Sequence, residues 1–251
     1  MDELSELKGR MRALRNVKKV KLVNLPKLSV MILRFAFVDV KELEMENASL
    51  LESHEVLGKV MRKKREEERR RVRREWCGKN WKWISISFIV SKLQQRSTFN
   101  YLSECVGSSI TKDMTELVIP SIRCNNEKIK MLDFRAFPQL KSIEIGDDCF
   151  MYMNKVKLID LSRLERVVIG MNCFTRKRDD WGYNPLRRFY LKNCERLREL
   201  KMGCFSFSEY SVCVIENVPS LEVIEMGEMD ENSWNFRYAS LELKSDYERM
   251  K

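Results

Sequence analysis

The chain has 251 residues, of which 44% are hydrophobic, and a formal net charge of +10. This hydrophobic fraction is close to that of globular proteins, so we exclude an intrinsically disordered chain and expect one repeat array or two modest domains. No secretory signal follows Met1, and no apolar run reaches the roughly 20 residues that a membrane span needs. We therefore expect a soluble protein without a membrane partner, located in the cytoplasm or, as the alternative, in the nucleus.

The excess positive charge lies in the N-terminal part of the chain. From Thr115 to the end, 22 basic side chains balance 22 acidic ones. A general affinity of the whole protein for nucleic acid is therefore not indicated.

The first 50 residues contain a diverged repeat. Three leucines spaced three residues apart end at Leu28 and are followed by an apolar run to Phe37, a pattern that aligns with residues 154–174. Arg34 stands where the later repeats have glycine. We interpret residues 1–50 as a repeat remnant, and two possibilities stay open: it stacks on the later repeats, or it is a recombined fragment without a dedicated function.

Residues 51–76 predict a basic charged helix. Opposite charges recur four residues apart, as in Arg62 with Glu66, and each such pair stabilises an exposed helix by a few tenths of a kcal/mol. The helix can be a solvated insertion, a docking site for nucleic acid or an acidic partner, or a coiled-coil arm or nuclear-import patch. The side chains that would bind nucleic acid are Arg62, Lys63, Lys64, Arg65, Arg69, Arg70, Arg71, Arg73, Arg74 and Trp81.

Residues 77–114 predict a capping segment. Its tryptophans lie next to lysines, as in platforms that stack bases, so residues 59–83 form the candidate nucleic-acid segment. Burial of the same tryptophans is the competing interpretation. A short helix is expected over residues 97–106, with Gly107 placed to end it. Such a segment would cover strand edges that otherwise invite aggregation.

Residues 115–244 contain a repeated unit. An apolar–polar alternation typical of a half-buried strand precedes a glycine in each unit, and a second alternating segment lies between these strands. Self-similarity of this kind indicates a stacked repeat architecture. Successive strands are 11 or 13 residues apart, which leaves no room for helices between them. The repeated glycines are Gly146, Gly170, Gly203 and Gly227, separated by 24, 33 and 24 residues.

Two positions of the unit have predicted roles. The glycine can adopt φ > 0 without steric cost where the chain turns. The phenylalanine four residues later is expected to fill the interior of the repeat. These phenylalanines are Phe150, Phe174 and Phe207.

One unit resembles a known family in detail. The spacing from Leu158 to Gly170 resembles the diverged BspA-type leucine-rich repeats that are abundant in protists, and it reads Leu158-x-x-Leu161-x-x-Leu164-x-x-Val167-x-Ile169-Gly170. The resemblance covers residues 115–244. It lacks a regular asparagine ladder, for which Asn193 and Asn217 are the only candidates. The resemblance implies protein interaction rather than catalysis.

The predicted fold class is mainly β: a leucine-rich-repeat-like β-solenoid with a charged α-helical insertion and a short α/β cap. The predicted segments are a repeat remnant (1–50), a basic helix (51–76), a cap (77–114), the repeat array (115–244) and a tail (245–251).

The predicted protein-contact surface combines a row of outward side chains with an inserted loop. The loop accounts for the 33-residue interval, and a purely solvated loop is its competing interpretation. Because the charges are mixed, no single ligand class is indicated. The residues are Glu144, Arg166, Val168, Lys201 and Glu225 on the strands, with Arg176, Arg178, Trp181 and Tyr183 in the loop.

Catalysis finds little support in the sequence. The single histidine, His54, has no local partner for a metal site or a Cys-His dyad, and the common nucleotide-binding motifs are absent. Cys149 and Cys173 share a repeat position and are expected to be buried thiols. We predict no catalytic residue, metal or cofactor. The expected function is a non-catalytic scaffold or interaction module for an unidentified protein; the alternative is nucleic-acid binding.

Overall fold

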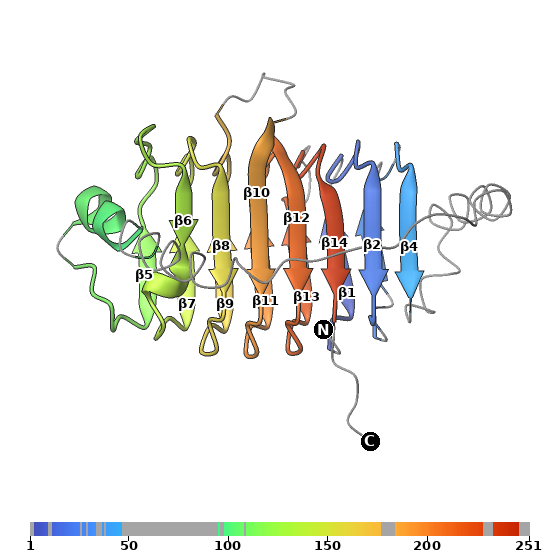
Figure 1. The fold of residues 1–251 in the computed structure, drawn as a ribbon, viewed down its shortest axis with the longest axis horizontal. Helices are drawn as coiled ribbons and strands as arrows, with labels where there is room; N and C mark the ends of the chain where they lie inside the picture. The colour runs from blue at the N-terminus through green and yellow to red at the C-terminus, as the bar shows by residue number, and fades with distance from the viewer. Residues whose placement is uncertain are drawn as a thin grey trace, which may run out of the picture.

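The computed structural model describes residues 3–9, 12–25, 27–28, 30–33, 37, 39–46, 95, 98–107, 109–176, 184–227 and 233–245. These residues form 14 strands in two parallel seven-stranded sheets (Figure 1). The odd-numbered strands make one sheet and the even-numbered strands make the other. We name them the odd sheet and the even sheet.

In spatial order, the odd sheet contains β3 (Val30–Leu33), β1 (Glu6–Gly9), β13 (Val223–Met226), β11 (Glu199–Met202), β9 (Arg166–Ile169), β7 (Ser142–Ile145) and β5 (Glu116–Ile119). The even sheet contains β4 (Glu42–Glu46), β2 (Lys19–Val23), β14 (Ser240–Lys244), β12 (Tyr210–Glu216), β10 (Asn184–Lys192), β8 (Lys155–Ile159) and β6 (Met131–Asp133). A 3-10 helix, η2 (Phe134–Ala136), follows β6.

The core lies between the two sheets, which face each other (Figure 1). Strand side chains alternate between faces, and the inward ones are apolar. In one pair of strands, Ile143 and Ile145 from the odd sheet and Val156 and Leu158 from the even sheet are all at most 3% exposed. One odd strand, the next even strand and the corner that joins them form what we call a rung. Each rung is closed by stacking on its neighbours.

The stacking order of the rungs differs from the chain order. β1 pairs with β13, where Leu7 lies opposite Ile224, and β2 pairs with β14, where Leu22 lies opposite Leu243. The two rungs of residues 3–46 (the N-terminal block) therefore extend the five rungs of residues 116–245 (the C-terminal block) beyond β13 and β14. The open question about the N-terminal repeat is answered: it stacks on the C-terminal repeats.

The predicted fold class is wrong. The chain was expected to form a leucine-rich-repeat-like solenoid with a charged helical insertion, and the described residues instead form two equal, parallel seven-stranded sheets. Two causes explain the error. The leucine spacing resembles that of leucine-rich repeats, although the strands it marks alternate between two parallel sheets, and local sequence does not show that β1 and β2 continue those sheets. The expected basic helix (51–76) lies outside the described residues.

The long corner joins each odd strand to the next even strand, and here a role predicted for glycine falls to other residues. Of the repeated glycines, Gly227 has the predicted positive φ, at 81°, whereas Gly146, Gly170 and Gly203 do not; Asn172 and Phe174 have positive φ instead, at 55° and 59°. Gly146, Gly170 and Gly203 are required by close approach between rungs. A Cβ on Gly170 would lie 2.8 Å from the backbone nitrogen of Asp147 in the rung beside it.

The predicted interior role of the phenylalanines is confirmed. Phe150, Phe174 and Phe207 are fully buried, with ring centroids 5.1 and 4.6 Å apart and nearly parallel planes. Phe236 continues the column at 4.9 Å from Phe207. This stack runs through the long corners of four rungs.

The short corner joins each even strand to the next odd strand. Asp160, Asn193, Asn217 and Asn24 occupy it with φ between 54° and 57°, a conformation that Asn and Asp tolerate better than other side chains. Asn193 and Asn217 thus hold equivalent places, as predicted. The Nδ2 atom of Asn193 donates a hydrogen bond of 2.8 Å to Oδ1 of Asp160 in the rung beside it.

The β5/β6 end of the stack carries a short helix over residues 98–106, shown in green in Figure 1. Gly107 follows it with φ of +112°, so both the helix and its end were predicted. Thr98 Oγ1 accepts a hydrogen bond of 2.8 Å from the backbone N–H of Asp133, at the end of β6. A disulfide between Cys105 and Cys124 fixes the helix to the first rung.

Candidate protein-contact surface

The outer face of the odd sheet gathers the predicted strand residues. Glu144, Val168, Lys201 and Glu225 lie opposite one another across β7, β9, β11 and β13 and form one outward row. Arg166 lies two residues before Val168 on β9, so it points to the same face in the adjacent row. The structure thus places all five strand residues on one surface.

Ion pairs across and along the strands order this surface. Arg166 Nε lies 2.8 Å from Oε2 of Glu199, and Lys201 Nζ lies 2.7 Å from Oε1 of the same carboxylate. The hydrogen bond from Lys201, together with that from Arg166, lowers the pKa of Glu199. The same contact raises the pKa of Lys201. Because these side chains are partly exposed, each pair contributes little to stability, about 0–1 kcal/mol.

A groove of about 390 Å³ opens on this face at the carboxyl ends of β9, β11 and β13. It forms where the glycines of three successive rungs leave no side chain to fill the space. Asp147, Lys201 and Glu225 place charge at the groove, and the partly exposed Val168 and Met171 add apolar surface, whereas the side chains of Ile169 and Met202 belong to the core. Its lining consists of Asp147, Val168, Ile169, Gly170, Met171, Lys201, Met202, Gly203, Glu225 and Gly227.

Several of these groove residues were not predicted. Asp147, Met171 and Met202 directly follow or precede the repeated glycines, so the spacing that revealed the repeat also marked their common location. Asp147 is held in place, because its Oδ1 accepts a hydrogen bond of 2.7 Å from the backbone N–H of Met171.

The surface ends in an apolar rim at β5. Val118 continues the outward row beside Glu144 and is 58% exposed, and Ile122 in the following turn is 74% exposed. Large exposed apolar side chains at the margin of a groove extend the area that a protein partner can cover.

The inserted loop is described only at its start. Arg176 is exposed, and its guanidinium carbon lies 5.7 Å from the ring centroid of Tyr152, in the long corner. No described contact joins Arg176 to the odd-sheet row. Arg178, Trp181 and Tyr183 lie outside the described residues, and so do all ten candidate nucleic-acid residues from Arg62 to Trp81.

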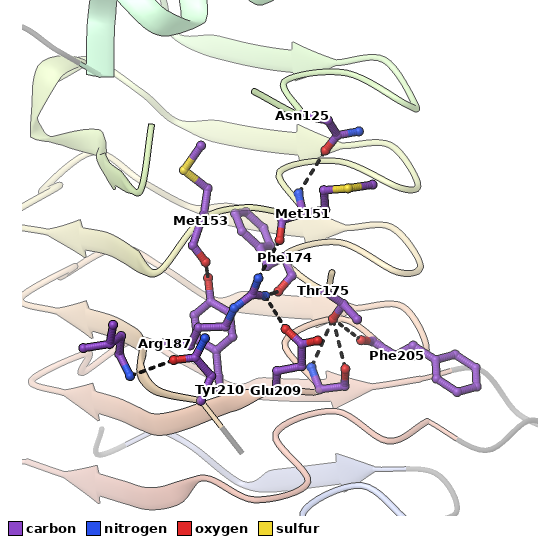
Figure 2. Close-up of polar contacts among 12 residues, drawn as sticks. Asn125, Met151, Met153, Phe174, Thr175, Arg187, Phe205, Glu209 and Tyr210 are labelled. Atoms are coloured by element: carbon purple, nitrogen blue, oxygen red, sulfur yellow. Dashed lines mark hydrogen bonds and ion pairs between the residues drawn. The ribbon is translucent and has the colours of Figure 1, made fainter. Parts of the chain in front are cut away.

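A buried polar cluster behind the long corner was not predicted (Figure 2). Arg187 Nη1 lies 2.8 Å from Oε2 of Glu209, with the two side chains 3% and 9% exposed. The same guanidinium donates to the carbonyl oxygens of Phe174 and Met151 at 2.6 and 2.7 Å. The cluster joins the corners of three rungs and therefore has a structural role. In the sequence, Arg187 and Glu209 look like ordinary surface charges.

The cysteine prediction is confirmed for Cys149 and Cys173, which are free and buried. The Cys173 thiol donates a hydrogen bond of 3.0 Å to the carbonyl of Gly146, in the place where Ser206 donates to Gly170 one rung further on. The neighbouring Cys173 thiol lowers the pKa of Cys149. Burial keeps this thiol from reagents in solution.

Three further findings concern metal ligands, membrane spans and relatives. In the described part of the chain, no three His, Cys, Asp or Glu side chains are grouped so that they could hold a metal ion. No described helix has the length and apolar character of a membrane span. Comparison of the chain with protein-family models, curated proteins and solved structures gives no match, so the leucine-rich-repeat resemblance stays a prediction.

Proposed function

We propose that this protein is a non-catalytic interaction module that binds a partner protein through the outer face of the odd sheet. The observation that carries the proposal is the groove beside the in-register row of Val168, Lys201 and Glu225. It joins an apolar centre to a charged margin, which is how the core and rim of a protein interface are arranged.

The rigidity of this face supports the same function. Val168, Lys201 and Glu225 are carried by strands that are hydrogen-bonded on both sides, and Lys201 is held by Glu199 at 2.7 Å. A surface that is ordered before binding loses less conformational entropy when a partner docks.

The direct test is capture of partners with the full chain as bait. Val168→Arg places a long charged side chain in the groove, and Val212→Arg makes the same change at a partly buried outward position on the even sheet. We expect proteins retained by the unsubstituted chain to fall at least about tenfold with Val168→Arg and to persist with Val212→Arg, since loss of an interface centre removes most binding energy. Equal capture by both variants, with matching circular dichroism, would refute the assignment of this face.

A second candidate function is nucleic-acid binding through residues 59–83, favoured by the charge excess before Thr115. Its test is a fluorescence-anisotropy titration of the full chain with labelled single-stranded RNA at about 50 and 200 mM salt. Binding through phosphates weakens steeply over this range, because bound counterions are released. Binding that is absent, or insensitive to salt, would eliminate this candidate.

A further inference from the structure

The contact between the two blocks is noncovalent throughout. It consists of the strand pairs β1–β13 and β2–β14, which bury Leu7 against Ile224 and Leu22 against Leu243. Backbone hydrogen bonds continue around the corner, where the N–H of Leu14 donates to the carbonyl of Asn235 at 3.0 Å. The N-terminal block thus docks as the next two rungs of the array.

The covalent connection between the blocks joins the ends farthest from this contact. The N-terminal block continues into the connection after β4, at one end of the stack, and the C-terminal block begins with β5 at the other end. Six strand spacings separate these ends, or about 29 Å. The disulfide of Cys105 to Cys124 anchors the chain at the β5 end, so residues 47–97 connect the two.

This connection is long enough for docking within one chain or between two. Fully extended, residues 47–97 could reach roughly 170 Å, several times the separation of the two ends. The contacts of β1 and β2 are identical whichever copy supplies β13 and β14. Only the effective concentration of the tethered block favours docking within one chain.

We propose that two copies of this chain exchange their N-terminal blocks, so that β1 and β2 of each copy pair with β13 and β14 of the other. The product is a closed dimer in which both contacts are reciprocal. No new interface is required, which makes exchange of an element a low-cost route to a dimer. The inference is independent of the proposed binding face.

The test uses a cysteine pair in the full-length chain. Glu6 and Val223 lie opposite each other on the outer face of the odd sheet, where neighbouring strands are about 4.8 Å apart, within the range of a disulfide. The variant Glu6→Cys/Val223→Cys is unfolded, refolded at concentrations from about 1 µM to 1 mM and oxidised. The control Arg166→Cys/Glu199→Cys joins β9 to β11 inside one block.

We expect crosslinked dimer in the Glu6/Val223 variant to rise about tenfold for each tenfold increase in concentration, towards the millimolar effective concentration of the tether. The control should give only crosslinks within one chain, and the unsubstituted chain gives the background. Size-exclusion chromatography of the refolded unsubstituted chain should show the same increase of dimer. The proposal is overturned if crosslinks in the Glu6/Val223 variant stay within one chain at every concentration, or if both variants dimerise equally.

Discussion

The N-terminal and C-terminal blocks build the same rung from different residues. At the interior position of the long corner, the C-terminal block uses stacked phenylalanines such as Phe174, with φ of 59°. The N-terminal block uses Leu14 and Phe37 at φ of 54° and 55°. The corner therefore requires a large apolar side chain in the left-handed conformation, and the choice of side chain is secondary.

The two ends of the stack differ in how their strand edges are protected. At the β5/β6 end, the helix over residues 98–106 and the Cys105–Cys124 disulfide cover the first rung. At the opposite end, β4 exposes Glu42 and Glu44, whose side chains are 67% and 50% exposed and face lysines of β2. Charges on an edge strand oppose pairing with another chain. Charged side chains on β4 thus protect the strand edge of the N-terminal block, whereas a helix and a disulfide protect the strand edge of the C-terminal block.

The largest expected effect comes from breaking the phenylalanine column. Phe174→Ala should lower the free energy of unfolding by about 3–5 kcal/mol, because a fully buried ring that contacts rings on both sides is replaced by a cavity. Leu14→Ala should cost less, about 2–3 kcal/mol, since a smaller side chain is removed. Urea denaturation measures both. An equal loss of unfolding free energy would contradict the larger contribution expected of a ring that stacks on rings on both sides.

Removing the disulfide tests the protected end. Cys105→Ser should destabilise the protein by about 3 kcal/mol, since the bridge closes a chain separation of 19 residues. Thermal unfolding with and without reductant provides the measurement. Reductant should lower the Tm of the unsubstituted chain and leave that of Cys105→Ser unchanged.

The close approach of neighbouring rungs at Gly170 predicts a smaller loss of stability when this glycine is substituted. Gly170→Ala should cost about 1–3 kcal/mol, because the added Cβ meets backbone atoms that cannot move aside. Ser142→Ala, on β7 of the same sheet, serves as the control and should lie within about 0.5 kcal/mol of the unsubstituted chain. A Gly170→Ala variant as stable as this control would refute the close approach.

Alkaline pH should weaken the C-terminal block specifically. Burial raises the pKa of Cys194 from 9.0 to about 12, so its protonated thiol favours the folded state fully below pH 9. Between pH 9 and 12 the unfolded chain loses this proton first, and stability should fall by about 1.4 kcal/mol per pH unit for this group. Residues 1–50 contain no cysteine. Cys194→Ala should reduce the slope of the unfolding free energy against pH by about 1.4 kcal/mol per pH unit, which is the contribution of one proton.

The features that could be predicted from the sequence are those set by residues close together in the chain. The alternating strands, the burial of Phe150, Phe174 and Phe207, and the helix ending at Gly107 each follow from a few neighbouring residues. The common face of Glu144, Val168 and Lys201 was predictable for the same reason.

Features that join distant residues could not be predicted. Leu7 and Ile224 are ordinary apolar strand residues, and nothing in their neighbourhoods says that β1 adds to β13. The Arg187–Glu209 pair is buried where the corners of three rungs meet, since Arg187 also donates to the carbonyl oxygens of Phe174 and Met151. These features depend on the order of stacking, which local sequence does not encode.

That order is the central claim, and a crosslink at low concentration tests it most directly. At about 1 µM, where docking within one chain dominates, oxidised Glu6→Cys/Val223→Cys should form an intrachain disulfide, because β1 lies beside β13. Val30→Cys/Glu116→Cys should form none, since β3 and β5 are at opposite ends of the odd sheet. A crosslink between positions 30 and 116, with none between 6 and 223, would mean that the rungs follow chain order and would contradict this account.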